Sequence, residues 1–205
     1  MGALVQIATG DRRLLDSIGE TMAEAARRSG AWLACRPGCT ECCIGPFAIT
    51  QLDARRLRAG LAALALADPA RAAALRSRVE AYVAAAAPVY PGEPISGMLR
   101  DEDALPESLD DLPCPALDPA TGCCDLYEAR PITCRTFGPA THIGEWTLGA
   151  CELCYIGATE EQMMACAVEI DPEDIENELL DALAQEGVGG MTIVAYALTS
   201  RAISE

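Results

Sequence analysis

Apolar residues in this chain recur mostly every three or four positions, which is the spacing of amphipathic helices. Near the N-terminus, Leu15, Ile18, Met22 and Ala25 would share one face of a helix. Gly30 follows this segment and is suited to end it, because glycine readily adopts the left-handed conformation found after helix ends. The pattern predicts a first helix that Gly30 ends.

Two more helices are predicted by their capping residues. Thr50 with Asp53 has a capping-box pattern, and Asp68 followed by Pro69 places an N-cap before a proline at the first helical position. The second of these helices should stop before Pro88, which cannot continue a helix. Positions at core spacing in the two helices are Leu57, Leu61 and Leu64, then Leu75, Val79, Val83 and Ala86.

The C-terminal part of the chain shows the same signals. Thr159 with Gln162 predicts the start of a helix. Asp171 followed by Pro172 predicts another, and a last helix is expected over residues 191–203. The helix after Pro172 should bury Ile175, Leu179 and Leu183 and end at the glycines Gly187, Gly189 and Gly190.

Two stretches lack this periodicity, residues 35–48 and residues 88–157. They hold ten of the eleven cysteines, and a segment as long as the second is unusual in a compact domain unless something holds it. Bound metal would do so, because its binding free energy becomes folding free energy. Short strands could form near residues 47–49 and 146–148.

We therefore predict a mainly α fold in which a helical scaffold carries a loop-rich lobe ligated to metal by cysteines. A chain of 205 residues suits a single domain, residues 1–205. Within it, the cysteine-cluster region would span about residues 35–155 and a helical C-terminal region residues 159–205.

The cysteines fall into three groups with short internal spacings. Thiolates held this close repel one another unless a cation lies between them, so a metal is the expected partner. Disulfides fit less well, because eleven is an odd number and a bridge between adjacent cysteines is strained. The groups are Cys35, Cys39, Cys42 and Cys43; Cys114, Cys123, Cys124 and Cys134; and Cys151 and Cys154.

Charge and composition argue against nucleic acid and membranes as partners of this chain. A formal net charge of −16 argues against binding to a nucleic-acid backbone. No uncharged apolar run approaches the length of a membrane span, and no basic residue precedes the short apolar run at residues 3–8, as a secretory signal would require. We expect a cytoplasmic protein, since a reducing compartment keeps clustered cysteines available for metals or redox chemistry.

Individual residues differ in how well they suit a metal. Cys39 and Cys42, like Cys151 and Cys154, have two intervening residues, which lets both sulfurs face one metal. Cys166 lies at core spacing in a helical segment and is expected to be a buried thiol. The single histidine, His142, could complete one coordination sphere but is expected to be exposed in a loop.

The stretch that begins at Cys114 and continues from Gly122 through Cys134 to Gly138 resembles the second half of the YkgJ-type cysteine-cluster (CxxCxxCC) family, described as a zinc- or iron-chelating domain. Residues 35–43 resemble its first half, although three residues rather than two separate Cys35 from Cys39. The resemblance covers about residues 35–155.

The resemblance also selects among adjacent cysteines. The family cysteine precedes a variable residue, an aliphatic residue and a tyrosine. This identifies Cys124, ahead of Tyr127, and places Cys123 at a variable position of the family pattern. A further downstream cysteine is usual, and both Cys151 and Cys154 qualify. The ligands implied are Cys35, Cys39, Cys42, Cys43, Cys114, Cys124, Cys134 and Cys151, with Cys154 as a ninth.

Charged residues near these cysteines suggest supporting roles. Arg36 and Arg135 adjoin expected ligands and Arg130 lies close to them in sequence, so a guanidinium could lower thiol pKa values and offset negative charge. We expect Arg130, Arg135 and Tyr127 to lie around the bound metal. The acidic segment 169–186 is expected to be a solvated helix face that could dock a basic protein partner.

Three functions follow from these observations. The first is a cytoplasmic protein that binds iron, as ions or an iron–sulfur cluster, or zinc; we prefer iron because eight or nine thiolates exceed the needs of one structural zinc. The second is a metal-dependent enzyme that modifies a protein or small molecule at an iron or iron–sulfur centre, as domains resembling this one are proposed to do. The third is metal storage or delivery.

Overall fold

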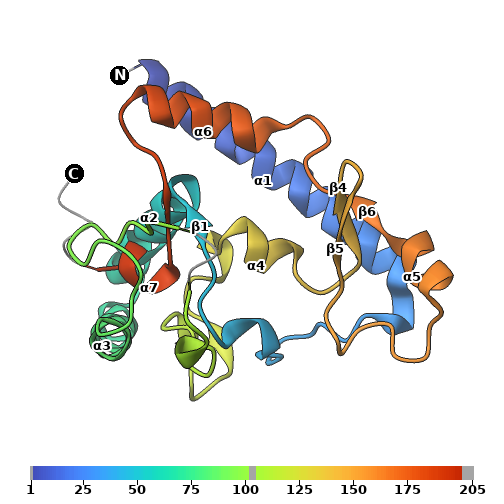
Figure 1. Ribbon diagram of the computed structural model, residues 1–205, viewed down its shortest axis with the longest axis horizontal. Coiled ribbons are helices and arrows are strands. Elements are labelled where there is room, and N and C mark those ends of the chain that lie inside the picture. The colour runs from blue at the N-terminus through green and yellow to red at the C-terminus, as the bar shows by residue number, and fades with distance from the viewer. Residues whose placement is uncertain (1, 102–104, 200–205) are drawn as a thin grey trace. The chain divides into compact units, whose positions relative to one another are not determined.

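The computed structural model describes residues 2–101 and 105–199 (Figure 1). It is 52% helical and 11% strand, with small two- and three-stranded sheets, so the predicted mainly α class is confirmed. Over these residues, no helix combines the length and the apolar character that crossing a membrane would require.

The chain divides into two compact units, and each is assembled from segments distant in sequence. One unit contains residues 1–36 and 132–187, and the other contains residues 37–131 and 188–205.

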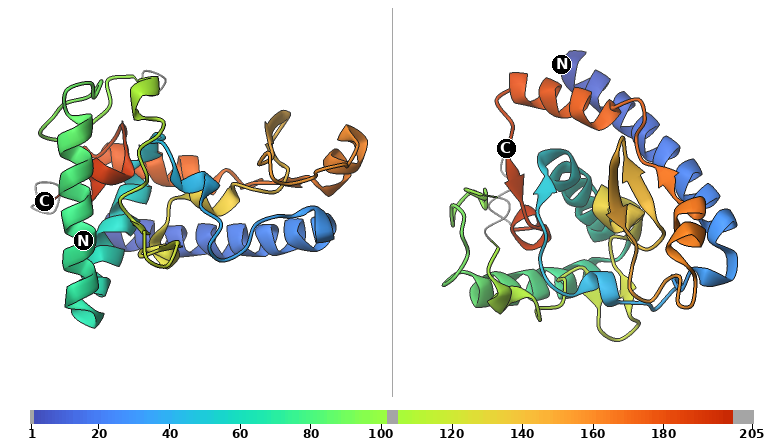
Figure 2. Two further views of the ribbon diagram at one scale, coloured as in Figure 1. Left: turned by 90° about the horizontal axis from the view of Figure 1, so that it is seen from below. Right: turned by 45° about the vertical axis from the view of Figure 1, so that its right-hand side comes forward.

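The first unit is built on the long helix α1 (Gly2–Ser29), which ends where predicted, at Gly30 with φ +51°. Helix α6 (Ile175–Gln185) lies antiparallel along the first half of α1 (Figures 1 and 2). Gly10 permits this close approach, because a Cβ at that position would lie 2.7 Å from the Leu179 side chain. Arg13 and Glu173 form an ion pair across the same contact.

Short elements complete the first unit. The three-stranded sheet has the order β5-β4-β6, with β4 (Thr141–Ile143) antiparallel to β5 (Trp146–Gly149) and parallel to β6 (Val168–Glu169). Helix α4 (Ile132–Thr136) precedes this sheet, and α5 (Glu160–Cys166) begins with the capping box predicted at Thr159 and Gln162. A 3-10 turn, η1 (Gly30–Trp32), follows α1.

The second unit contains the predicted pair of helices α2 (Gln51–Ala67) and α3 (Pro69–Ala86). Their N-terminal caps are confirmed: Thr50 accepts the N–H of Asp53 at 3.2 Å, and Asp68 accepts the N–H of Arg71 at 3.0 Å. Most of the predicted core positions are buried, including Leu57, Leu61, Leu75, Val79 and Ala86.

The rest of the second unit consists of short elements around this helix pair. Strand β1 (Ile49–Thr50) pairs antiparallel with β7 (Met191–Thr192), and β2 (Leu117–Asp118) pairs antiparallel with β3 (Cys123–Cys124). Helix α7 (Val194–Ala197) packs against α2 and α3. Three single 3-10 turns are η2 (Glu41–Cys43), η3 (Glu107–Leu109) and η4 (Tyr127–Ala129).

Two predicted helices differ from the structure. Met191 and Thr192 form strand β7 instead of starting a helix over 191–203, because their backbone pairs with β1; α7 then covers only Val194–Ala197, and residues 200–205 lie outside the described residues. Helix α6 begins at Ile175, later than Pro172 suggested. The Asp171 carboxylate still caps it, accepting the N–H groups of Ile175 at 3.1 Å and Glu176 at 2.8 Å.

The predicted strands are present with small shifts, and the irregular stretch is more ordered than expected. The strand at 146–148 corresponds to β5, whereas that at 47–49 is displaced to Ile49–Thr50. The stretch over residues 88–157 contains the β2–β3 hairpin and helix α4, which the sequence pattern did not reveal.

Candidate functional site

All eleven cysteines lie in the described part of the chain, and no two of them are joined by a disulfide. They are shared between the units, each of which brings together cysteines from different predicted groups. The second unit holds Cys39, Cys42, Cys43, Cys114, Cys123 and Cys124, and the first unit holds Cys35, Cys134, Cys151, Cys154 and Cys166.

In the second unit, backbone hydrogen bonds join the first cysteine group to Cys114. The N–H of Cys114 donates to the carbonyl oxygen of Cys43 at 2.7 Å, and the N–H of Gly45 donates to Leu112 O at 2.9 Å. Ile44 forms an antiparallel bridge with Pro113 between these bonds. The two segments are therefore held in a fixed register even though about 70 residues separate them in the sequence.

The β2–β3 hairpin then brings Cys124 to the same region. Leu117 donates its N–H to Cys114 O at 3.0 Å, and Leu117 is paired with Cys124 across the hairpin. Cys114 and Cys124 both pack against the core that α2 and α3 form. Two cysteines that the sequence places ten residues apart thus face one apolar core.

Cys123 lies on the other face of the same strand. Adjacent residues of a strand point to opposite sides, and Cys123 is exposed while Cys124 is half-buried. The Cys123 thiol lies 3.7 Å from the carbonyl oxygen of Thr121, within its own turn. The turn is fixed by Asp118, whose carboxylate accepts the Ala120 N–H at 3.1 Å and the Thr121 hydroxyl at 2.7 Å.

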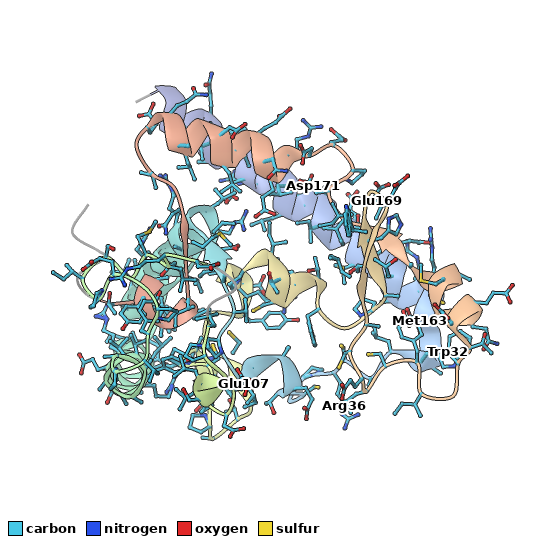
Figure 3. The ribbon with its side chains drawn as sticks, viewed as in Figure 1. Trp32, Arg36, Glu107, Met163, Glu169 and Asp171 are labelled. Carbon is cyan, nitrogen blue, oxygen red and sulfur yellow. The ribbon has the colours of Figure 1, made fainter. Side chains whose placement is uncertain are left out.

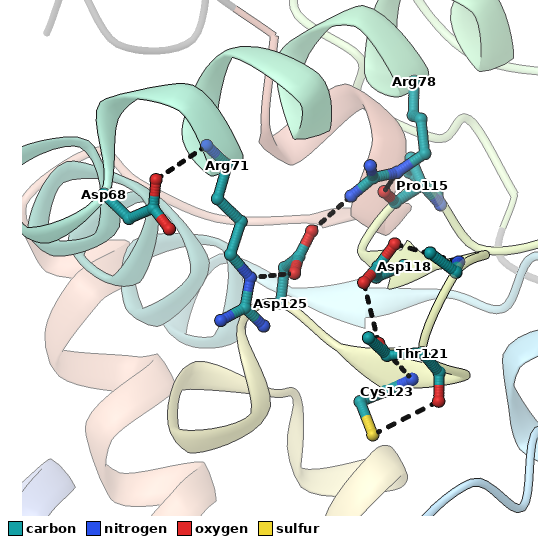
Figure 4. Close-up of polar contacts among 9 residues, drawn as sticks. Asp68, Arg71, Arg78, Pro115, Asp118, Thr121, Cys123 and Asp125 are labelled. Atoms are coloured by element: carbon teal, nitrogen blue, oxygen red, sulfur yellow. Dashed lines mark hydrogen bonds and ion pairs between the residues drawn. The ribbon is translucent and has the colours of Figure 1, made fainter.

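A buried carboxylate fixes the hairpin to helix α3 (Figure 4). The side chain of Asp125, only 1% exposed, forms ion pairs with Arg71 and Arg78 of α3. Arg78 also donates its Nε–H to the carbonyl oxygen of Pro115 at 2.9 Å. Helix α3 thus holds both Pro115, which follows Cys114, and Asp125, which follows Cys124. The sequence did not reveal this role of Asp125, Arg71 and Arg78.

The four thiols of Cys42, Cys43, Cys114 and Cys124 influence one another electrostatically. The side chains of Cys42 and Cys43 share a hydrogen bond, which lowers the pKa of Cys42 to about 6 and raises the pKa of Cys43. Burial raises the pKa of Cys114 to about 11 and also raises that of Cys124. The charge of a Cys42 thiolate adds to the rise at each of the other three, so the four thiols form one interacting set.

Arg130 provides positive charge beside this set. Its charge lowers the pKa values of Cys42 and Cys124, although it is not the largest influence on either. The guanidinium carbon lies 3.7 Å from the centre of the Tyr127 ring, in a cation–π contact. Arg130 is therefore close enough to two of the expected ligands to affect their pKa values, and Tyr127 contacts Arg130.

Cys39 occupies a separate turn of the second unit. Gly38 before it has φ +86°, and a Cβ at Gly122 of the hairpin turn would lie 3.7 Å from the Gly38 Cα. The Cys39 turn therefore packs beside the β2–β3 turn.

In the first unit, Gly138 connects two expected ligands. A Cβ at Gly138 would lie only 2.5 Å from Cys35 Sγ, so the sulfur rests against the glycine backbone. The carbonyl oxygen of Gly138 accepts the N–H of Cys151 at 3.0 Å, and Cys151 O accepts the N–H of Cys154 at 2.8 Å. Cys134 lies on α4, just before Gly138 in the chain, and is half-buried.

Tyr155, which the sequence analysis missed, anchors the turn that holds Cys151 and Cys154. Its backbone N–H donates to Trp32 O at 2.8 Å. Its buried hydroxyl accepts the N–H of Ala140 at 3.1 Å and lies 2.6 Å from Ser29 Oγ. The Ser29 hydroxyl donates to Ala25 O at 2.7 Å, so the Tyr155 hydroxyl is the donor to Ser29.

Other residues named from the sequence lie as follows. Cys166 is buried and its thiol donates to Arg28 O at 3.3 Å, as expected for a core cysteine. His142, expected to be exposed in a loop, is instead half-buried because it belongs to strand β4, with Nδ1 3.1 Å from Gly144 O. Arg36 is exposed, whereas Arg135, in the last turn of α4, is half-buried. The acidic segment 169–186 is not one helix, because Glu169 belongs to β6.

Over residues 2–101 and 105–199, no three side chains of histidine, cysteine, aspartate or glutamate converge in the manner of metal ligands. A metal bound by the four interacting thiols would therefore require them to turn toward a common point. A cysteine does this by rotating about one side-chain bond, with the backbone register unchanged.

Comparison with protein families identifies a matching family. The model of the CxxCxxCC family, described as "Putative zinc- or iron-chelating domain", matches residues 34–152, which is more than half of the chain. Neither the curated proteins nor the solved structures yield a significant match.

Proposed function

Since the chain belongs to this CxxCxxCC family of cysteine-rich domains, we propose that it holds iron, as ions or as an iron–sulfur cluster, in preference to zinc, through cysteine thiolates. The observation that carries this proposal is the hydrogen bond between Cys114 and Cys43, which brings both halves of the family motif together. Metal would supply the positive charge that clustered thiolates need.

In the second unit, the proposed ligands are Cys42, Cys43, Cys114 and Cys124, with Cys39 on the adjoining turn. The donor set fits, because four thiols are the ligands that zinc and iron–sulfur sites prefer. The rise in the pKa of Cys114 and Cys124 supports the same reading, since these half-buried sulfurs would ionise readily only beside a cation.

In the first unit, the proposed ligands are Cys35, Cys134, Cys151 and Cys154. Contact of the Cys35 sulfur with Gly138, and the hydrogen bond from Cys151 to the same glycine, support including this pair. Gly138, with φ +126°, leaves space for the sulfur that any side chain would fill. We leave Cys123 and Cys166 out, because the first is directed to its own turn and the second to α1.

The preference for iron rests on the number of thiolates. One structural zinc takes four ligands, and the two units together offer nine cysteines with suitable surroundings. Iron–sulfur clusters use the same ligands and would add electron transfer to the chemistry of the domain. A cytoplasmic location is part of the proposal, because thiols stay reduced there.

Anaerobic purification followed by metal analysis, an acid-labile sulfide assay and a visible spectrum tests this proposal. We expect bound iron, and for a cluster also sulfide and a brown colour. A colourless protein with stoichiometric zinc and no sulfide would overturn the preference for iron while leaving chelation intact. A protein that holds neither metal, even after reconstitution, would overturn the proposal as a whole.

A further inference from the structure

The first unit contains a cavity of about 440 Å³, and of the proposed metal ligands only Cys151 is among the described residues that line it. It lies between the end of α4, the β4–β5 hairpin and the segment that leads into α6. Its volume is within the range usual for ligand pockets. Figure 3 shows Asp171, one of its lining residues, at the start of α6 and close to the hairpin.

One part of the cavity lining is apolar and open to solvent. Phe137, Ile143 and Leu148 all line it, and they are 48%, 49% and 56% exposed. The hairpin also presents Trp146, which is 80% exposed and is the strand partner of Ile143 in the lining. Large exposed apolar side chains gathered in this way are typical of binding surfaces.

Another part of the lining is acidic. Asp171, Asp174 and Glu176 contribute to it, and among the described residues that line the cavity there is no lysine, arginine or histidine. The first two carboxylates are held in place: Asp171 caps α6, and Asp174 Oδ1 accepts the Asn177 side-chain amide at 2.6 Å. Fixed carboxylates beside apolar side chains complement a side chain that carries a positive charge at the end of several methylene groups.

We infer that this cavity binds a lysine or arginine side chain of a partner protein whose neighbouring residues are apolar. The methylene groups of such a side chain would contact Ile143 and Leu148 while its charge meets Asp174. A protein segment fits better than a small cation, because Trp146 extends the apolar surface beyond the cavity and aromatic side chains are frequent anchors of protein interfaces.

The inference places the basic partner expected from the acidic segment 169–186 at one defined position. It does not depend on bound metal, although Cys151, a proposed ligand, also lines the cavity. Metal content is therefore measured on every sample used in the binding experiment, so that the two proposals can fail separately.

The test is fluorescence anisotropy with the full chain and three labelled peptides that differ only at a central Lys, Arg or Gln between leucines. We expect one of the basic peptides to bind at least about tenfold more tightly than the Gln peptide, and to weaken several-fold when salt is raised from about 0.05 to about 0.5 M. Equal binding of the three peptides, or none, would overturn the inference, whatever the metal content.

Variants locate the site. Asp174→Asn should weaken binding of the basic peptide at least about fivefold, and asparagine tolerates the φ of +56° at this position. Leu148→Ser should also weaken it. Glu178→Gln, on the exposed side of α6 and outside the cavity lining, is the matched control and should bind normally. Unchanged binding by both cavity variants, or full competition by spermidine at equal concentration, would contradict the proposed occupant.

Discussion

The backbone N–H of Cys114 donates a 2.7 Å hydrogen bond to the carbonyl oxygen of Cys43. This bond sets the register between the two segments of the cysteine motif, and the bridge between Ile44 and Pro113 extends it. Because the backbone fixes this register, metal binding would require the cysteine side chains to change rotamer while the two segments keep their pairing.

Replacing Asp125 tests how the Cys124 hairpin is held. Asp125→Ala removes the buried partner of Arg71 and Arg78, and we expect a loss of about 3 kcal/mol in the free energy of unfolding. Denaturant unfolding followed by circular dichroism measures this loss. Glu80→Gln, an exposed change on the same helix, should stay within about 0.5 kcal/mol of the unmodified chain. A similar small effect for Asp125→Ala would show that the ion pairs do not fix the hairpin.

The Tyr155 hydroxyl should matter for the turn that carries Cys151 and Cys154. Tyr155→Phe leaves the buried N–H of Ala140 without its acceptor, which should cost about 1–3 kcal/mol of unfolding free energy. Tyr127→Phe is the control, because its ring is exposed and would keep its contact with Arg130. Thermal and denaturant unfolding compare the two. Equal stability of both variants would contradict an anchoring role for the hydroxyl.

Alkaline pH should destabilise the second unit through its buried tyrosines. Burial raises the pKa of Tyr90 to about 12, so its phenol stays neutral in the folded chain while an unfolded tyrosine ionises near pH 10. The resulting stability is complete below about pH 10 and is lost as the pH approaches 12. Each such tyrosine contributes a slope of about 1.4 kcal/mol per pH unit in this window.

Tyr82, whose pKa burial also raises to about 12, should contribute in the same way. Unfolding free energies measured from pH 9 to pH 12 should therefore fall less steeply for Tyr90→Phe than for the unmodified chain. Phenolate absorbance recorded alongside should show late ionisation of both tyrosines. Parallel pH curves for the two proteins would refute the contribution of Tyr90.

Metal removal should lower stability, because metal that binds only the folded chain stabilises it. At a free metal concentration about 1,000 times the dissociation constant, the difference is about 4 kcal/mol. Unfolding before and after anaerobic chelation, with thiols kept reduced, measures it, and adding metal back should restore it. A chain that unfolds identically in both states does not use metal to hold its cysteine segments together.

Local sequence signals predicted much of the helical fold. The caps at Thr50, Asp68 and Thr159 were located correctly because a cap depends on neighbouring residues and backbone N–H groups. The failure at Met191 has a different cause: its backbone pairs with β1, about 140 residues earlier, and such pairing overrides a helical pattern.

The residues of the candidate site were likewise predictable only where the signal is local in the sequence. Spacing and family resemblance pointed to the cysteines and to Arg130, whereas Asp125 and Tyr155 were missed. Asp125 gains its role from arginines on a distant helix, and Tyr155 from a chain of hydrogen bonds that reaches α1. A single aspartate or tyrosine has no periodic or spaced pattern by which such long-range partners can be predicted.

The adjacent cysteines Cys123 and Cys124 distinguish a proposed metal ligand from a neighbour that is not one. They point to opposite faces of one strand, so serine at either position changes the same number of sulfurs. The measurement is the metal-to-protein ratio of Cys124→Ser and Cys123→Ser, purified anaerobically and dialysed against a weak chelator. We expect Cys124→Ser to lose metal, with affinity at least about tenfold lower, and Cys123→Ser to retain it. Full metal retention by Cys124→Ser, or loss by Cys123→Ser alone, would contradict the proposed centre.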